Sequence, residues 1–224
     1  MAYMRPERDD MFGYGDAEAD DDKREQLQLR NPAKVKEISE RLLAELDRMT
    51  VPTISSRADV IGTIGRTMTF GFGNTRRGYN EFSSNKQHPA LLKLLAEFGN
   101  AVVPKGWTYE AITLNHGVKA KKHIDIHNNG RSVIIGIGNY TGGKVSVWDT
   151  DGKNKIDYDI HFKPTMFNGA RMYHQTTPFK GDRYSMIFYK QAKRGHSKGV
   201  EMKGSGEDYQ EHAPIMAWAG GTGK

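Results

Sequence analysis

The stretch KKHIDIHNNGRSVIIGIGNYTGGKVSVWD, residues 121–149, decides the fold class of this 224-residue chain. Two runs rich in β-branched residues, 131–140 and 144–149, lie on either side of a Thr-Gly-Gly turn. Short runs of this composition, bounded by glycine and asparagine, are typical of strands. Asp151-Gly152 then predicts a hairpin. Similar runs occupy 109–115, 155–162, 165–169, 170–174 and 183–191. Seven or more such strands predict a sandwich or jelly roll.

Two helices are expected before the strands. The first spans about 32–49, with Asn31 as its N-cap, Pro32 at its first position, and apolar residues on one face. The second spans about 89–98, and Gly99 is expected to be its C-cap. The predicted fold class is therefore α+β, mainly β: a double-stranded β-helix (jelly roll) core with flanking helices.

Charge divides the chain into three parts. Residues 1–25 hold nine acidic and four basic residues, which gives this segment a charge of −5. Because the net charge of the whole chain is +6, residues 26–224 carry +11. We expect residues 1–30 to be an acidic, mostly disordered segment and 31–192 to be a single domain with its core at about 109–192. Residues 193–224 are expected to be a loose, basic and glycine-rich tail. A basic body suits a polyanion such as nucleic acid, or is ordinary solvated charge.

The composition excludes several classes. The chain contains no cysteine, so disulfides, thiolate metal sites and cysteine nucleophiles are excluded. It has no apolar run long enough to span a membrane, and no apolar stretch near the N-terminus that would be typical of a secretory signal. We therefore expect an intracellular protein with no membrane partner, and a monomer.

One group of residues could carry chemistry. His123 and Asp125 are two residues apart in an extended segment, so both side chains can face one point. His174 follows about fifty residues later. Two imidazoles and a carboxylate form the facial triad of non-haem iron(II) oxygenases, which leaves three coordination positions open. Arg183, nine residues beyond His174, could grip a carboxylate through two parallel hydrogen bonds. The pattern predicts a site for Fe(II), 2-oxoglutarate and O2.

Two segments carry the resemblance to a known family. HIDIHNNG at 123–130, followed by an apolar strand and Gly142-Gly143, and RYSMIFY at 183–189 resemble the TET/JBP dioxygenases over roughly residues 60–192. These enzymes use iron(II) and 2-oxoglutarate to oxidise the methyl group of a pyrimidine in DNA. The resemblance implies that His123, Asp125 and His174 bind iron and that Arg183 and Ser185 bind 2-oxoglutarate.

The resemblance also implies a base pocket. Asn128 would read a flipped base and Tyr189 would stack on it. The next reader in the family is usually a histidine, and here it is Gln191, which leaves open whether the base is 5-methylcytosine or thymine. A nucleotide must leave the duplex to reach a deep metal site, and a basic rim would hold its backbone. The candidate rim residues are Arg66, Arg76 and Arg77, with Lys119, Lys121 and Lys122.

The preferred prediction is a 5-methylcytosine hydroxylase of DNA that flips its target base. Alternatives remain: a thymine hydroxylase, an AlkB-like demethylase, or another 2-oxoglutarate oxygenase acting on protein or small molecules. AlkB-type enzymes typically carry a second arginine six residues after the first, where this chain has Tyr189. A non-catalytic nucleic-acid-binding jelly roll would predict a broken triad, and all three residues are present.

Overall fold

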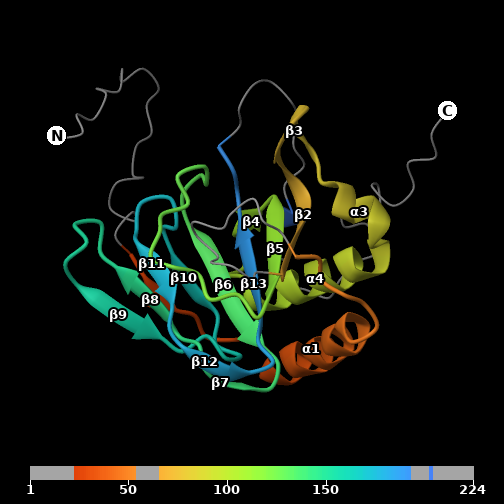
Figure 1. Ribbon diagram of the computed structural model, residues 1–224, viewed down its shortest axis with the longest axis horizontal. Coiled ribbons are helices and arrows are strands. Elements are labelled where there is room, and N and C mark those ends of the chain that lie inside the picture. The colour runs from red at the N-terminus through yellow and green to blue at the C-terminus, as the bar shows by residue number, and fades with distance from the viewer. Residues whose placement is uncertain (1–22, 54–65, 193–201, 204–224) are drawn as a thin grey trace.

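The computed structural model describes residues 23–53, 66–192 and 202–203 (Figure 1). A seven-stranded antiparallel sheet lies at its centre, in the order β1-β10-β6-β13-β5-β2-β3. We call it the major sheet. Its strands are β1 (Glu25–Gln26), β2 (Arg66–Thr75), β3 (Gly78–Glu81), β5 (Ala111–His116), β6 (Ser132–Ile137), β10 (Thr165–Phe167) and β13 (Tyr184–Tyr189).

Smaller sheets complete the β structure. The minor sheet has the order β11-β8-β9, and β12 pairs with β7. Their strands are β7 (Tyr140–Gly142), β8 (Val145–Trp148), β9 (Lys155–Tyr158), β11 (His174–Thr176) and β12 (Phe179–Gly181). The minor sheet lies beside the strands of the major sheet in Figure 1. Two antiparallel sheets with flanking helices confirm the predicted mainly β, jelly-roll fold class.

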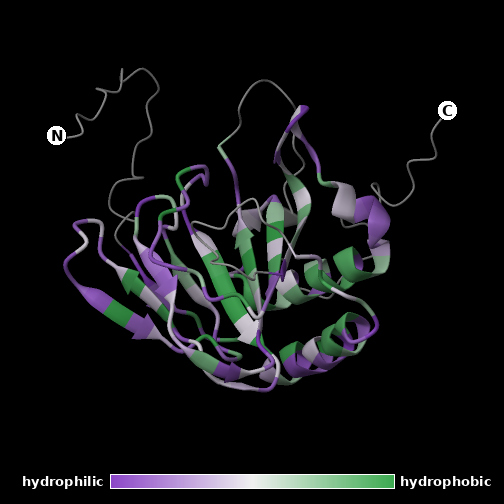
Figure 2. Ribbon diagram, in the orientation of Figure 1, coloured by the Kyte–Doolittle hydropathy of each residue, from purple (hydrophilic) through white to green (hydrophobic). Residues whose placement is uncertain are grey.

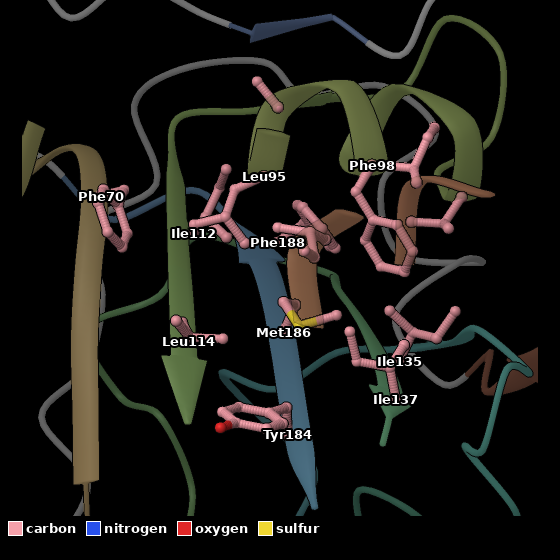
Figure 3. Close-up of a cluster of buried hydrophobic side chains, with 14 of the residues drawn as sticks. Phe70, Leu95, Phe98, Ile112, Leu114, Ile135, Ile137, Tyr184, Met186 and Phe188 are labelled. Atoms are coloured by element: carbon pink, nitrogen blue, oxygen red, sulfur yellow. The ribbon is translucent and has the colours of Figure 1, made fainter. Parts of the chain in front are cut away.

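One face of the major sheet packs against helices. α1 (Pro32–Leu46) contacts α4 (Pro89–Val102), and both contribute buried side chains to one large core. On the sheet, this core takes alternate residues of adjacent strands, because successive side chains of a strand point to opposite faces. Figure 3 shows them: Phe70, Ile112, Leu114, Ile135, Ile137, Met186 and Phe188, beneath Leu95 and Phe98 of α4.

A second, smaller core lies between the two sheets. Ile134 of β6 and Phe167 of β10 pack there with Val145 and Val147 of β8. β9 is the outer strand of the minor sheet, and three of its four residues are exposed. Figure 2 accordingly shows β9 as mostly hydrophilic, whereas the central strands of the major sheet are largely hydrophobic.

Both predicted helices are present, but both end at other residues than predicted: the first ends at Leu46 instead of about residue 49, and the second continues to Val102. The Asn31 side chain accepts a hydrogen bond from the Lys34 N–H, as expected of an N-cap. Gly99, however, lies inside α4, and Val103 is the C-cap. A Cβ at position 99 would overlap the Tyr109 hydroxyl and the Phe188 ring. This glycine therefore permits close packing instead of ending the helix. A short helix, α3 (Ser83–Gln87), was not predicted.

Several predicted strands differ from the observed ones. Residues 170–172 lie in a turn, and β11 begins at His174 instead of ending there. Only 155–158 of the segment 155–162 is a strand. β2 and β3 form a hairpin where a strand followed by a loop was expected at 63–80; residues 63–65 lie outside the described residues. The predicted hairpin at Asp151-Gly152 is confirmed, because β8 and β9 pair around it.

The N-terminal boundary of the fold comes earlier than predicted. Residues 23–30 were assigned to a disordered segment, yet β1 pairs with β10, and Arg131 forms an ion pair with Glu25. Near the other end, β14 (Met202–Lys203) pairs with β4 (Thr108–Tyr109). The rest of both predicted terminal segments, 1–22 and most of 193–224, lies outside the described residues. No helix among the described residues is long and apolar enough to cross a membrane.

Candidate metal and cosubstrate site

The structure brings His123, Asp125 and His174 together. One ligand atom from each lies within 4.8 Å of the others. The Nε2 atom of His123 is 3.7 Å from one Asp125 carboxylate oxygen, and the Nε2 atom of His174 is 3.6 Å from the other. Within the described ranges, this is the one group of three or more such side chains arranged closely enough to hold a metal ion.

Backbone pairing places the three ligands. The N–H of His123 donates to the His174 carbonyl, and the N–H of His174 donates to the His123 carbonyl, at 3.0 and 2.9 Å. The two imidazoles therefore stand side by side across an antiparallel bridge, with ring centroids 4.2 Å apart. The N–H of Asp125 donates to the Gly169 carbonyl and fixes the third ligand. Residues far apart in the sequence thus meet at one point.

Hydrogen bonds also select the tautomers that a metal requires. Nδ1 of His123 is 2.7 Å from the Lys121 carbonyl, and Nδ1 of His174 is 3.0 Å from the Met172 carbonyl. A carbonyl can only accept, so each Nδ1 carries the proton and donates. The lone pair is left on each Nε2, which faces Asp125. This is the usual arrangement around metal-binding histidines, and two nitrogens with one carboxylate suit Fe(II).

Arg183 is a buried cation that lacks a carboxylate partner among the described residues. Its exposed fraction is 1%, and its Nη1 donates to the Ser185 hydroxyl at 3.4 Å. Its Nε and Nη2 atoms have no hydrogen-bond partner within the described part of the chain. Burial lowers the pKa of the guanidinium, although an arginine remains charged at neutral pH. A buried charge of this kind is costly without an anion, so the site fits a carboxylate ligand.

Tyr140 is a site residue that the sequence reasoning missed. Its hydroxyl is buried with no hydrogen-bond partner among the described residues, and the Arg183 guanidinium carbon lies 5.6 Å from its ring centroid. Burial raises the pKa of Tyr140 to about 12, so the hydroxyl keeps its proton. Only its position directly before the Thr141-Gly142-Gly143 turn could have signalled it.

Two glycines make room for this pair. A Cβ at Gly136 would overlap the Tyr140 hydroxyl, and a Cβ at Gly143 would come within 2.8 Å of Arg183 Nε. Gly136 pairs with Ser185, so the tyrosine hydroxyl lies on the same face of the sheet as that serine. Tyr140, Arg183 and Ser185 therefore surround one small, polar, donor-rich region, which is what a dicarboxylate needs.

A cavity of about 580 Å³ lies over this face of the major sheet and includes all three metal-binding side chains in its walls. Polar residues of the sheet line it, among them Thr113, Asn115 and Ser185. Asn115 lies between Thr67 and Ser185 in register, so these side chains form a polar row across three strands. Neither Thr113 nor Asn115 was singled out from the sequence, because each lies in a strand with no distinctive spacing.

The three predicted base readers all line the cavity. The Tyr189 hydroxyl is 3.1 Å from that of Thr113. The Gln191 Oε1 accepts from the Asn74 N–H at 2.7 Å, which turns the amide NH2 of Gln191 toward other partners. Asn128 Nδ2 is 3.5 Å from an Asp125 carboxylate oxygen, so this amide also supports the metal ligand. The structure therefore brings the predicted readers together at one side of the metal group.

The predicted arginines separate into two groups. Arg76 and Arg77 lie exposed in the turn between β2 and β3. Asn74 connects this turn to the cavity wall through Gln191 and through the Ala192 carbonyl. Arg66 is at the opposite end of β2, in register with His116 and Tyr184. Its side chain alternates with Thr67 and shares the face of Met68 and Phe70, so the structure does not bring it to the cavity.

No family model matches the sequence, and no curated protein matches it. Similar solved structures include a prolyl-4-hydroxylase from Pseudomonas putida, at 12% identity and a TM-score of 0.48, covering 75% of this chain and 92% of that one. A 2OG-Fe(II) oxygenase family oxidoreductase from Burkholderia pseudomallei has 13% identity and a TM-score of 0.46, with 75% and 98% covered. NgTET1 in complex with 5mC DNA has 14% identity and a TM-score of 0.45, with 79% and 72% covered.

Proposed function

We propose that this chain is an iron(II)- and 2-oxoglutarate-dependent dioxygenase that hydroxylates the methyl group of 5-methylcytosine in DNA. The observation that carries the cofactor assignment is a candidate metal-binding triad in the wall of a cavity that Ser185 also lines, because Ser185 accepts a hydrogen bond from the buried Arg183, whose Nε and Nη2 have no partner among the described residues. A structural ion pair would have supplied Arg183 with a carboxylate from the protein. Its unused donors instead favour a carboxylate that arrives with a ligand.

The residues of the chain have distinct tasks in this proposal. Bound Fe(II) and 2-oxoglutarate supply the oxidising chemistry when O2 is present. His123, Asp125 and His174 would hold the metal, and their Nδ1 and backbone hydrogen bonds keep them in position before it binds. Arg183, assisted by Ser185 and the Tyr140 hydroxyl, would orient the cosubstrate by its far carboxylate. The buried surroundings of Arg183 exclude water from that end.

A flipped pyrimidine fits the remaining part of the cavity. Tyr189 offers an aromatic ring, while Asn128 and Gln191 offer amides that can donate and accept at the edge of a base. The basic β2–β3 turn beside Gln191 could contact phosphates. The preference for 5-methylcytosine over thymine rests on the family resemblance and is the finer part of the proposal.

An AlkB-like demethylase is the main alternative, because the triad and Arg183 would serve an N-methyl substrate equally well. Hydroxylation of an N-methyl group releases formaldehyde, whereas hydroxylation of the C5 methyl leaves a stable alcohol on the base. Tyr189, with its hydroxyl bound to Thr113, occupies the position where AlkB-type enzymes typically carry their second arginine. This observation favours the C5-methyl substrate.

Two measurements test the proposal in sequence. Anaerobic addition of Fe(II) and then 2-oxoglutarate should produce a visible charge-transfer band, and its absence would reject every oxygenase assignment. Incubation with 5-methylcytosine DNA, thymine DNA, N-methylated DNA and RNA should then yield 5-hydroxymethylcytosine by nucleoside mass spectrometry. Formaldehyde from N-methylated DNA, without that product, would establish the AlkB-like alternative.

A further inference from the structure

Ile126 is a large apolar side chain that the described part of the chain leaves mostly exposed. Its exposed fraction is 72%, the highest among the large hydrophobic residues that the structure describes. It follows the metal ligand Asp125 directly, and it forms part of the cavity wall. Exposed single apolar residues are common on surfaces, but an isoleucine at the entrance of a candidate active site is placed to meet a substrate.

The turn that carries Ile126 is fixed on both sides. The N–H of Asn128 donates to the Asp125 carbonyl at 2.8 Å and closes the turn. The Gly169 carbonyl accepts a hydrogen bond from the Asp125 N–H, and the His127 carbonyl accepts one from the Ala192 N–H, each at 2.9 Å. The side chain of Ile126 is therefore presented on an anchored backbone, as an inserting residue requires.

Basic residues lie on the segments that adjoin this turn. Lys121 and Lys122 precede the metal ligand His123 and are exposed, and the Lys122 ammonium lies 4.2 Å from the Trp148 ring centroid. On the other side, the Ala192 N–H donates to the His127 carbonyl, and the Ala192 carbonyl accepts from the Asn74 side chain. Asn74 lies next to the turn that carries the exposed Arg76 and Arg77. An apolar tip with basic residues on the adjoining segments would complement a base stack flanked by phosphate backbones.

We propose that Ile126 is a wedge that enters the base stack of duplex DNA and fills the space left by the flipped nucleotide. The inference rests on the proposed nucleic-acid substrate and adds the residue that makes a duplex accessible. Apolar side chains, isoleucine among them, are inserted between base steps by proteins that deform DNA. A wedge next to Asp125 and Asn128 would act beside the pocket that receives the base.

The test compares duplex with single-stranded DNA, because only the duplex requires a wedge. Both carry one 5-methylcytosine in the same sequence, and 5-hydroxymethylcytosine is measured by mass spectrometry. Ile126→Ala should lower turnover on the duplex by about tenfold and leave single-strand turnover within about twofold. Ile126→Met, which keeps an apolar tip, should recover most of the duplex turnover. Ile156→Ala, at a half-exposed isoleucine of β9, is the matched control and should change neither.

A second readout does not depend on turnover. A duplex with 2-aminopurine next to the target base should gain fluorescence when the wild-type chain binds, and Ile126→Ala should reduce that gain at saturating protein. Equal losses on both substrates, no loss on either, or an unchanged fluorescence gain would overturn the wedge. Failure of the wild-type chain to oxidise even the single strand would count against the proposed function, while the fluorescence would still decide the role of Ile126.

Discussion

The two faces of β13 carry different side chains and have different surroundings: one lies in the hydrophobic core and the other lines the cavity. Tyr184, Met186 and Phe188 are buried in the core under α1 and α4, and they meet only apolar or aromatic neighbours across the sheet. Ser185, Ile187 and Tyr189 face the cavity instead, together with Thr113 and Asn115 of β5. One strand thus separates the main hydrophobic core from the candidate binding cavity.

This difference has an energetic meaning. The helix-covered face gains stability from buried apolar area and close packing. The cavity side contains buried polar atoms without partners among the described residues, such as Arg183 Nε and the Tyr140 hydroxyl, which cost stability until a ligand satisfies them. Substitutions on the first face should therefore reduce stability, and substitutions around the cavity should reduce binding or turnover at nearly constant stability.

The largest expected effect is on turnover. His174→Ala removes a metal ligand, and we expect 5-hydroxymethylcytosine formation to fall by at least about 1,000-fold, measured by nucleoside mass spectrometry. The melting temperature should change little, because the ring lies at the cavity wall. His88→Ala, at the N-terminus of α4 where the histidine side chain makes no capping hydrogen bond, is the control. Product formation by the His174 variant would show that the third ligand is assigned wrongly.

Leu114→Ala tests the opposite face. The leucine is fully buried against the helices, so we expect a loss of about 2–5 kcal/mol in the free energy of unfolding, measured with urea. Thr113→Val, one residue away on the cavity side, should cost about 1 kcal/mol or less and should mainly change activity through Tyr189. A reversed ranking of the two stabilities would contradict the division between the faces.

The variant Arg183→Met tests cosubstrate binding and the stability of the ligand-free protein at a single position. Loss of the guanidinium should weaken 2-oxoglutarate binding by about 100-fold, measured by titration of the Fe(II)-loaded protein. The ligand-free protein should be as stable as the wild type or more stable, since an incompletely satisfied buried charge has been replaced by an apolar chain. Arg66→Met, on the other face of the sheet, should leave the affinity unchanged. A strongly destabilised Arg183 variant would indicate that the guanidinium serves the fold.

Tyr140→Phe should have the smallest effect, a loss of about fivefold in 2-oxoglutarate affinity, because one neutral hydrogen bond is removed. The pKa of this tyrosine is raised to about 12 by burial, so the hydroxyl remains protonated well above neutral pH. The ratio of wild-type to variant affinity should therefore be constant between about pH 6 and pH 9. A ratio that falls toward 1 within that range would mean that Tyr140 ionises early, in conflict with its burial.

Particular residues show why some features were predictable and others were not. The strands 132–137 and 184–189 could be recognised because their apolar content is local information. The ligands His123, Asp125 and His174 could be paired because their spacing is a known metal pattern. Gly99 was misread as a helix end, since its real reason is contact with Tyr109 and Phe188, both distant in the sequence. Residues 23–30 were misassigned because the pairing partner of β1 comes some 140 residues later.

The mainly β fold class, the two main helices and the three candidate metal-binding side chains could be predicted from local stretches, because composition, periodicity and spacing are properties of such stretches. The folded chain was needed to show that Arg66 lies away from the cavity, that Tyr140 lies beside Arg183, and that Ile126 is exposed. Sheet register sets which face a side chain occupies, and burial sets which polar atoms lack partners. Both depend on strands that meet across long sequence separations.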